Sequence, residues 1–291
     1  MTAPRGPRPV DVRSLLACAR RADPRWFQIA VLASLVTYGL TVLRFDLPPA
    51  QVAITVGAAL ASQVVLSSAV RVPRLELKSA LISSLSLCLL LRTSAPALAG
   101  VASIVAIASK FAIRVGDKHV FNPTNLALAV MLAASDRVWI SSGQWGNTAI
   151  FAAALALAGL LVVQRSARSD VTVAFLATYV ALVFGRSAWL GEPMAIPLHR
   201  LESGALVLFA FFMISDPRTT PDARLGRIGF AALVAAGAWY VQFRLFRTNG
   251  LVWSLVACST LTPLVDRLLR GPRYQWDRPV TRVSAPALAA A

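Results

Sequence analysis

Charged side chains are scarce in this 291-residue chain, in which Asp, Glu, Lys and Arg together make up 14% of the residues. A water-soluble domain carries about a quarter of its residues charged. Here 57% of the residues are hydrophobic and the mean hydropathy is +0.65. A soluble fold of this composition would expose apolar surface that only lipid or a partner covers. The composition excludes a soluble or disordered protein and indicates an integral membrane protein.

Cysteine and histidine are equally rare, which limits the chemistry available. The three cysteines, Cys18, Cys88 and Cys258, have no spacing typical of a metal or redox pair. The two histidines, His119 and His199, fall on opposite sides of the membrane in the topology derived below, which argues against a two-histidine metal site. No Ser-His-Asp set, carboxylate pair or phosphate-binding glycine loop is present. The sequence therefore predicts no catalytic residue and no metal site.

Ten charge-free runs dominate the rest of the chain. A helix crosses the hydrocarbon core with about 20 apolar residues. Three runs are shorter and are expected to tilt, to break or to be sheltered by neighbours, namely Ser79–Leu91, Val171–Gly185 and Ser203–Ser215. The others are Trp26–Leu43, Leu47–Val70, Thr93–Ser109, Val120–Ser135, Val138–Gln164, Ile228–Phe243 and Thr248–Val265. We predict an all-α integral membrane fold of about ten transmembrane helices.

The cations between these runs are unevenly distributed. With the N-terminus inside, all but seven of the 29 Lys and Arg residues lie on the inner side. The seven are Arg44, Arg92, Arg137, Arg186, Arg200, Arg244 and Arg247. This bias predicts that both termini are cytoplasmic, and it explains the net charge of +16 without a nucleic-acid partner, because the positive face meets anionic lipid.

The predicted organisation has three parts. Residues 1–25 form a basic cytoplasmic tail, and residues 26–270 form one polytopic membrane domain with halves at about 26–140 and 145–270. Residues 271–291, which are rich in proline and lack an apolar period, form a disordered cytoplasmic tail.

Two polar steps interrupt the apolar pattern at the same predicted membrane face. Asn122–Pro123, followed by Asn125, lies at the junction of the fourth and fifth runs, near the start of the fifth. Asp216–Pro217, followed by Thr219 and Thr220, separates the eighth and ninth. Asn or Asp before Pro marks a helix start, and exposed helix N-termini favour anions or a group that becomes anionic. We predict that the two steps form one site; the alternative, that each merely starts a helix, stays open.

A flavin matches the chemistry of such a site. The uracil-like edge of its ring suits Asn122 and Asn125, and reduction builds negative charge that helix N-termini stabilise. Asp216 would cap a helix or bind the ring N3–H, while Thr219 and Thr220 would supply hydroxyl contacts. The flanking Pro123 and Pro217 would fix the two steps.

Three cations precede the Asn-Pro step, namely Lys110, Arg114 and Lys118. They could bind a flavin phosphate or the acidic face of a partner. The alternative interpretation is that they anchor the helices at the positive side of the membrane.

The motifs around the second step resemble a known family. They read Ala-Phe-Phe-Met at Ala210–Met213, Asp-Pro-Arg-Thr at Asp216–Thr219, Gly-Arg at Gly226–Arg227 and Pro-Leu-Val-Asp-Arg at Pro263–Arg267. With Lys118–Pro123 in the first half, their order resembles the membrane-embedded D subunit of the Rnf electron-transport complex. It is also similar to its relative, the B subunit of the sodium-translocating NADH:quinone reductase.

The resemblance implies a urea-transporter-like bundle of two inverted five-helix halves in the bacterial inner membrane. It also implies a flavin-binding subunit in electron transport coupled to ion translocation, working with other membrane subunits rather than as a stand-alone enzyme. Covalent FMN in that family is held by the threonine of a Ser-Gly-Ala-Thr motif. Here Leu206 follows Ser203–Gly204–Ala205, so we expect non-covalent riboflavin or FMN. A non-redox solute transporter or exporter on the same scaffold is the alternative.

Overall fold

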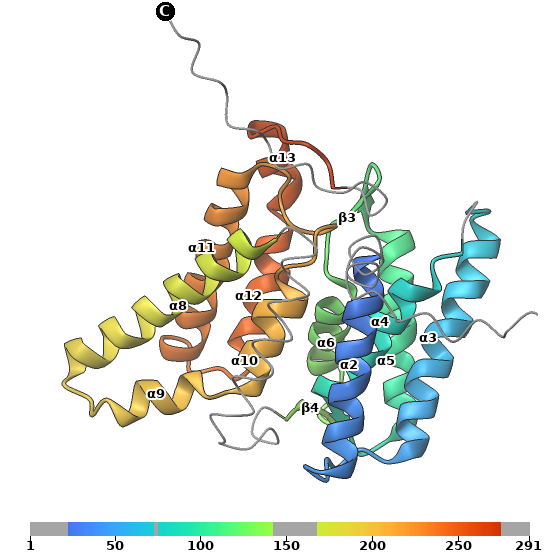
Figure 1. Ribbon diagram of the computed structural model, residues 1–291, viewed down its shortest axis with the longest axis horizontal. Helices are drawn as coiled ribbons and strands as arrows, with labels where there is room; N and C mark the ends of the chain where they lie inside the picture. Colours follow the sequence, from blue (N-terminus) through green and yellow to red (C-terminus); the bar gives the residue numbers. More distant parts are fainter. Residues whose placement is uncertain (1–22, 73–74, 142–167, 275–291) are drawn as a thin grey trace, which may run out of the picture.

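The computed structural model describes residues 23–72, 75–141 and 168–274, and this part of the chain is mostly helical (Figure 1). The first half contains α2 (Pro24–Thr41), α3 (Pro49–Ala69), α4 (Leu77–Leu90), α5 (Pro96–Ala112) and α6 (Pro123–Ala134). The second half contains α8 (Ser169–Leu190), α9 (Ala195–Leu201), α10 (Gly204–Leu208), the π-helical turn η2 (Phe209–Met213), α11 (Arg224–Phe243), α12 (Gly250–Ser259) and α13 (Thr262–Leu268).

The structure confirms the prediction of a mainly helical protein with apolar helices that could span a membrane. Among the described residues, α3 and α8 are each long and apolar enough to cross a membrane. Two bent helix pairs meet the same criterion only when each pair is taken together: α9 meets α10 and η2 at 50°, and α12 meets α13 at 46°. The first break precedes the short run Ser203–Ser215, which was expected to be irregular. The sixth run, Val138–Gln164, lies mostly outside the described residues, as do most of both predicted tails, so ten spans and an inverted repeat stay predictions.

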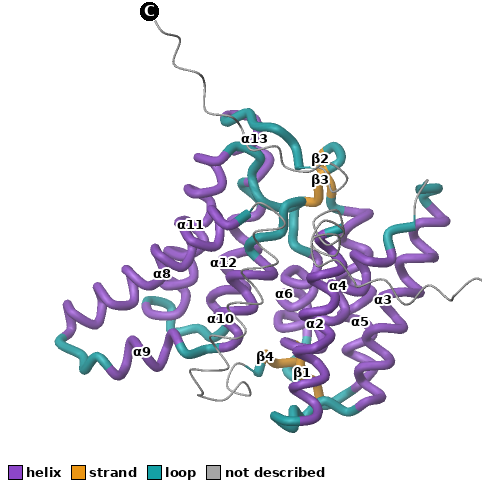
Figure 2. Tube along the Cα trace, viewed as in Figure 1, coloured by secondary structure: helices purple, strands orange, loops and turns teal. Residues whose placement is uncertain are grey.

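The described residues include two pairs of short strands, which the apolar pattern did not predict and which lie at opposite ends of the bundle (Figure 2). β1 (Leu91–Thr93) pairs antiparallel with β4 (Val138–Ile140). β2 (Arg114–Val115) pairs with β3 (Lys118–His119) across a turn in which Gly116 has a φ of +61°. Only glycine adopts this conformation readily. The turn reverses the chain after α5 and leads it to the start of α6.

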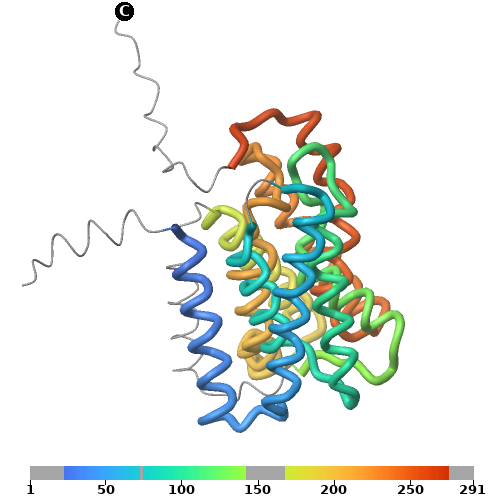
Figure 3. Tube along the Cα trace, turned by 90° about the vertical axis from the view of Figure 1, so that its right-hand side faces the viewer, coloured from blue at the N-terminus to red at the C-terminus, as the bar shows by residue number. Residues whose placement is uncertain are grey.

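The two halves lie side by side, and the loops around β3 and α13 gather at the same end of the bundle (Figure 1). Viewed from the side, the helices of the first half run roughly parallel to one another (Figure 3). Within the halves, α3 packs on α5, and α11 packs on both α8 and α12. Between them, α6 packs on α12, where the Asn125 Nδ2 donates to the Val252 carbonyl at 3.1 Å.

The loops that the cation count placed on one side contact each other. Lys118 of β3 forms ion pairs with Asp222 and Asp266 of the second half. On the other side, the guanidinium of Arg92 lies 5.3 Å from the ring centre of Phe45. The predicted grouping of the loops is therefore consistent with the fold, while the assignment of one end to the cytoplasm stays a prediction.

Candidate functional site

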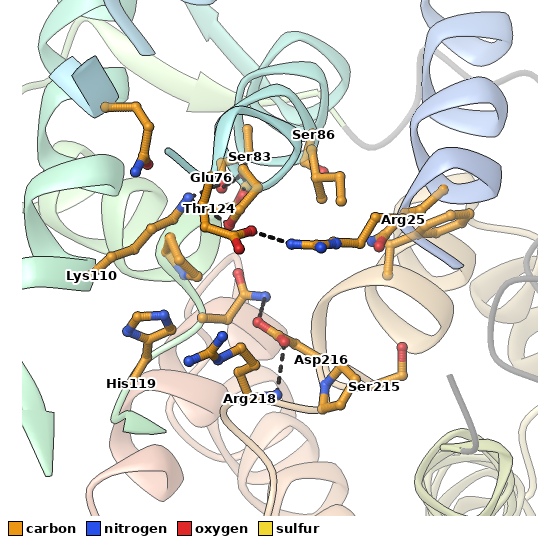
Figure 4. Close-up of a pocket in the computed structure, with 18 of the residues that line it drawn as sticks. Arg25, Glu76, Ser83, Ser86, Lys110, His119, Thr124, Ser215, Asp216 and Arg218 are labelled. Carbon is orange, nitrogen blue, oxygen red and sulfur yellow. Dashed lines mark hydrogen bonds and ion pairs between the residues drawn. The ribbon is translucent and has the colours of Figure 1, made fainter. Parts of the chain in front are cut away.

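A cavity of about 340 Å³ lies where the two halves meet. Small-molecule sites have volumes of about 300–1,000 Å³. The walls come from α2, α3, α4, α5, the start of α6 and the segment from η2 to Arg218. Apolar surface is supplied by Ile82, Phe111, Phe211 and Phe212. The charged lining consists of Arg25, Lys110, Arg114, Arg218, Glu76 and Asp216 (Figure 4), so cations outnumber carboxylates.

The two Asx-Pro steps meet at this cavity, as predicted. The Asn122 side-chain oxygen accepts from the Asn125 backbone N–H at 3.0 Å, which makes Asn122 the N-cap of α6 with Pro123 as its first residue. The Asn122 Nδ2 donates to Asp216 Oδ2 and to the Met213 carbonyl, both at 3.3 Å. Asn122 therefore both starts a helix and ties the two halves together.

Asp216 does not cap a helix, so of its two expected roles only the contact with the ring N3–H stays a prediction. The next helix, α11, begins only at Arg224, because a helix starting at Pro217 would place Pro221 where its ring excludes the helical hydrogen bond. The Asp216 Oδ1 instead accepts from the Arg218 backbone N–H at 3.0 Å. Burial raises the pKa of Asp216, although the Arg218 backbone N–H and the charges of Arg218 and Lys110 act in the opposite direction.

Four other predicted site residues do not line the cavity, but they form hydrogen bonds or ion pairs within and between the segments around it. Asn125 is buried and bonded to α12. The hydroxyls of Thr219 and Thr220 donate to the Asp216 carbonyl at 3.3 and 3.2 Å. Lys118 Nζ lies 3.0 Å from Asp222 Oδ1 and 2.7 Å from Asp266 Oδ2. Of the predicted residues, Asn122, Pro123, Asp216 and Pro217 line the cavity itself.

Lys110, for which the sequence left both a ligand contact and a membrane anchor open, lines the cavity. It is 5% exposed, and its ammonium donates to the Ser79 carbonyl and hydroxyl at 3.1 and 3.0 Å (Figure 4). A buried ammonium needs a compensating partner because burial removes its hydration. Both of these contacts are to neutral groups, so Lys110 places a hydrogen-bond donor in this wall without an ion-pair partner among the described residues.

The sequence did not single out His119, Gln63 or the first helical turn of α2 as parts of the site. His119 lines the cavity, where burial and then the charges of Arg218, Lys110 and Arg114 lower its pKa to about 3. Gln63 belongs to a buried face of α3 on which every fourth residue is polar except Ala59. That face includes Gln51, Thr55, Gln63 and Ser67, all buried. The four-residue spacing of these polar side chains was the sequence signal that could have identified this face.

Arg25 was placed in the basic tail, yet it lies in the first turn of α2 and lines the cavity. It forms an ion pair with Glu76 (Figure 4) and a second one with Asp23. Burial raises the pKa of Asp23, but hydrogen bonds from Arg25 and Lys78 outweigh that effect and bring it to about 2. The Asp23–Arg25–Glu76 set thus fixes α2 against the start of α4.

A wider cleft of about 1450 Å³ adjoins the cavity. The two share the lining residues Arg25, Glu76, His119, Pro217 and Arg218. Further lining comes from Lys118, Asp222, Asp266 and Tyr274. The cleft gives the cavity a polar approach from the end of the bundle that carries β3 and α13.

The N-cap role of Asn122 gives a first testable prediction. Asn122→Ala removes the cap and the donor to Asp216, and we expect the free energy of unfolding to fall by about 2 kcal/mol. Asn122→Ser keeps a capping oxygen and should recover about half of that loss. Thermal unfolding in detergent measures both variants. Equal stability of the alanine variant and the wild type would show that Asn122 does not start α6.

His119 gives a second prediction, on pH. The native side chain takes up a proton only near pH 3, while in the unfolded chain it does so near its ordinary value of 6.5. Below pH 6.5 the unfolded state binds more protons, so stability falls as the pH falls. At pH 5 the loss relative to His119→Gln should be about 2 kcal/mol. His199→Gln, at a side chain 68% exposed, is the control; identical pH profiles of wild type and His119→Gln would contradict the prediction.

Apolar helices around a buried charged cavity define this chain as a helical membrane protein with a polar site between its two halves. Residues 134–275 match the NQR2, RnfD, RnfE family, which confirms the resemblance inferred from the motifs. The D subunit of the ion-translocating oxidoreductase complex of Cronobacter sakazakii is 32% identical over 137 residues, covering 46% of this chain and 37% of that protein. The D subunits from Escherichia coli and Citrobacter koseri are 31% and 30% identical over 137 and 118 residues.

The matched segment carries only one wall of the cavity. The chain spans little more than a third of the length of these curated relatives, since the alignments cover 37%, 33% and 37% of them. Asp216, Pro217 and Arg218 lie within residues 134–275, which match the family. The walls from α2 to the start of α6 precede that segment.

Proposed function

We propose that this protein is an RnfD-type subunit of a membrane-bound, ion-translocating electron-transport complex and that it binds a flavin without a covalent bond in the cavity between its halves. The family match and the names of the relatives support the complex. The observation that supports a flavin is the cavity itself, which is of small-molecule size and lined by more cations than carboxylates. Other membrane subunits would be its electron-transfer partners in the bacterial inner membrane.

The residues present fit a flavin. Phe111, Phe211 and Phe212 offer apolar surface for a flat ring. Lys110 and Arg218 offer positive charge to a ring that becomes more electron-rich on reduction. A bound flavin would supply the capacity to take up and release electrons, while the chain would orient it, exclude water and set its electrostatics.

The local structure also bears on the mode of attachment. Ser203, which opens the tetrapeptide ending in Leu206, is the N-cap of α10, and its hydroxyl accepts from the Leu206 N–H at 3.4 Å. The Leu206 side chain is buried in the core and has no hydroxyl to form a phosphoester. We therefore propose riboflavin or FMN held only by non-covalent contacts.

A fluorescence titration tests the proposal. Purified protein in mild detergent is titrated with riboflavin and, separately, with FMN, and quenching of flavin fluorescence is followed. We expect saturable binding with one flavin per chain. Tighter binding of FMN would place its phosphate near Arg114 or Arg218, whereas equal binding would leave the phosphate in the open cleft. Absence of saturable quenching with both flavins would contradict the proposal.

The broken helices favour solute transport as the second candidate. In secondary transporters, interrupted helices form the substrate site near the middle of the membrane, and α10 with η2 follows such a break and ends beside the cavity. A folded protein that stays colourless after incubation with flavins, and whose reconstitution in vesicles increases solute flux, would support transport instead of electron transfer.

A further inference from the structure

Gln63, a residue of the cavity wall, carries a buried hydrogen-bond acceptor that has no partner among the described residues. The residue lies in α3, lines the cavity and is 4% exposed. Its Nε2 donates to the Ser67 hydroxyl at 3.0 Å, but its Oε1 has no partner among the described residues. A buried acceptor without a partner is destabilising, so it calls for an explanation.

Packing between helices does not explain Gln63, as its neighbours on the same face show. The Thr55 hydroxyl donates to the Gln51 carbonyl at 2.7 Å, and the Ser103 hydroxyl of α5 donates to the Thr55 carbonyl at 2.9 Å. These groups thus form hydrogen bonds with one another at the interface between α3 and α5. Neither Gln51 nor Thr55 lines the cavity, whereas Gln63 does. The oxygen without a partner therefore belongs to a residue of the cavity wall, and the oxygen itself is buried there.

Lys110 supplies the complementary donor from α5. Its ammonium carries three hydrogens, and the contacts to the Ser79 carbonyl and hydroxyl use two of them. One cavity thus holds a neutral acceptor and a charged donor. An imide group, which has an N–H between two carbonyls, presents the matching pattern of one donor flanked by acceptors.

We propose that Gln63 determines ligand specificity by accepting a hydrogen bond from the imide N–H of a heterocyclic ligand, with Lys110 donating to the adjacent carbonyl oxygen. This inference rests on the proposed flavin function, because the flavin ring carries such an imide at N3. Neither side chain expected from the sequence to read this edge offers a free acceptor to the cavity, because Asn125, whose Oδ1 also lacks a partner among the described residues, does not line it. The Asn122 oxygen caps α6, and the Asn125 Nδ2 is bonded to α12.

The test compares riboflavin with N3-methylriboflavin, in which the imide hydrogen is replaced. Dissociation constants are measured by fluorescence quenching for the wild type, for Gln63→Met and for the control Gln51→Met. Methionine keeps the length of the glutamine side chain but removes the amide. Gln51 is buried on the same face of α3 and does not line the cavity, so its substitution controls for loss of a buried amide.

We expect the wild type and Gln51→Met to bind the methylated flavin at least about tenfold more weakly than riboflavin, because a site built to bond an N–H rejects the analogue that lacks it. In Gln63→Met the two flavins should bind within about twofold of each other. Equal binding of both flavins by the wild type, or undiminished discrimination in Gln63→Met, would overturn the role of Gln63 alone. No binding of riboflavin by the folded wild type would overturn the proposed function and this inference together. The wild-type comparison needs no variant, so poor folding of Gln63→Met does not remove the test.

Discussion

Replacing Lys118 by methionine is expected to lower the free energy of unfolding by about 3 kcal/mol. Lys118 Nζ lies 3.0 Å from Asp222 and 2.7 Å from Asp266, and the three side chains are 21%, 12% and 18% exposed. The Asp266 carboxylate also accepts from the Asp222 backbone N–H at 2.7 Å. Removing the ammonium leaves two carboxylates facing each other with little water, and breaking such a buried set costs about 3–5 kcal/mol. Partial exposure places the expected loss at the lower limit.

The matched control is Arg273→Met, at an ion pair in the same part of the bundle. Arg273 pairs with Asp117 at 3.9 Å, and the two side chains are 76% and 91% exposed. Exposed pairs contribute about 0–1 kcal/mol, so this variant should unfold like the wild type. Thermal unfolding in detergent, at low and high salt, measures both. If Lys118→Met and Arg273→Met were equally stable, the connection of β3 to α13 would not hold the halves together.

Replacing Lys110 by methionine is expected to weaken flavin binding without lowering the free energy of unfolding. The ammonium is 5% exposed, and the structure gives it two neutral hydrogen-bond partners on Ser79. Exchanging a buried charge for an apolar side chain of similar volume is often neutral or stabilising, so the free energy of unfolding should stay level or rise by about 1 kcal/mol. Flavin affinity should fall by about tenfold or more, because a charged hydrogen bond contributes about 1.5–3 kcal/mol.

Lys78→Met is the control variant, which should lower stability without changing riboflavin binding. Lys78 pairs with Asp23 at 2.8 Å and does not line the cavity. Its replacement should lower stability slightly and leave the dissociation constant for riboflavin within about twofold of the wild type. The midpoint potential of bound flavin gives a second readout: loss of the Lys110 charge should make it more negative. A Lys110→Met protein that binds riboflavin as tightly as the wild type would exclude Lys110 from the binding site.

The helices could be predicted because burial in lipid requires long runs without charge. Nearly every run that falls within the described residues contains a helix close to the predicted bounds, as with Trp26–Leu43 and α2. What could not be predicted was where those helices break. Periodicity does not reveal the bend before Gly204 or the pairing of β1 with β4, because both depend on contacts between distant segments.

The site was predicted in part, for a physical reason. The N-cap at Asn122 could be predicted because it depends only on neighbouring residues. The Asn122 side chain accepts from the backbone N–H three residues later. Pro221 was the local signal against a helix that starts at Pro217, because proline at that position cannot make the helical hydrogen bond. Lys110 and Gln63 depend on tertiary packing: a lysine in the last turn of a helix looks like an interfacial anchor until a neighbouring helix buries it.

The most direct test of the central claim is the visible absorbance spectrum of the protein, purified in mild detergent from its native membrane, before and after acid precipitation. We predict flavin absorption bands in the folded protein and release of the yellow chromophore into the supernatant on acid treatment, as required for a non-covalent flavin. A chromophore retained in the pellet would contradict the assignment of non-covalent attachment. A folded, colourless protein that remains colourless after incubation with riboflavin or FMN would contradict the flavin-binding function itself.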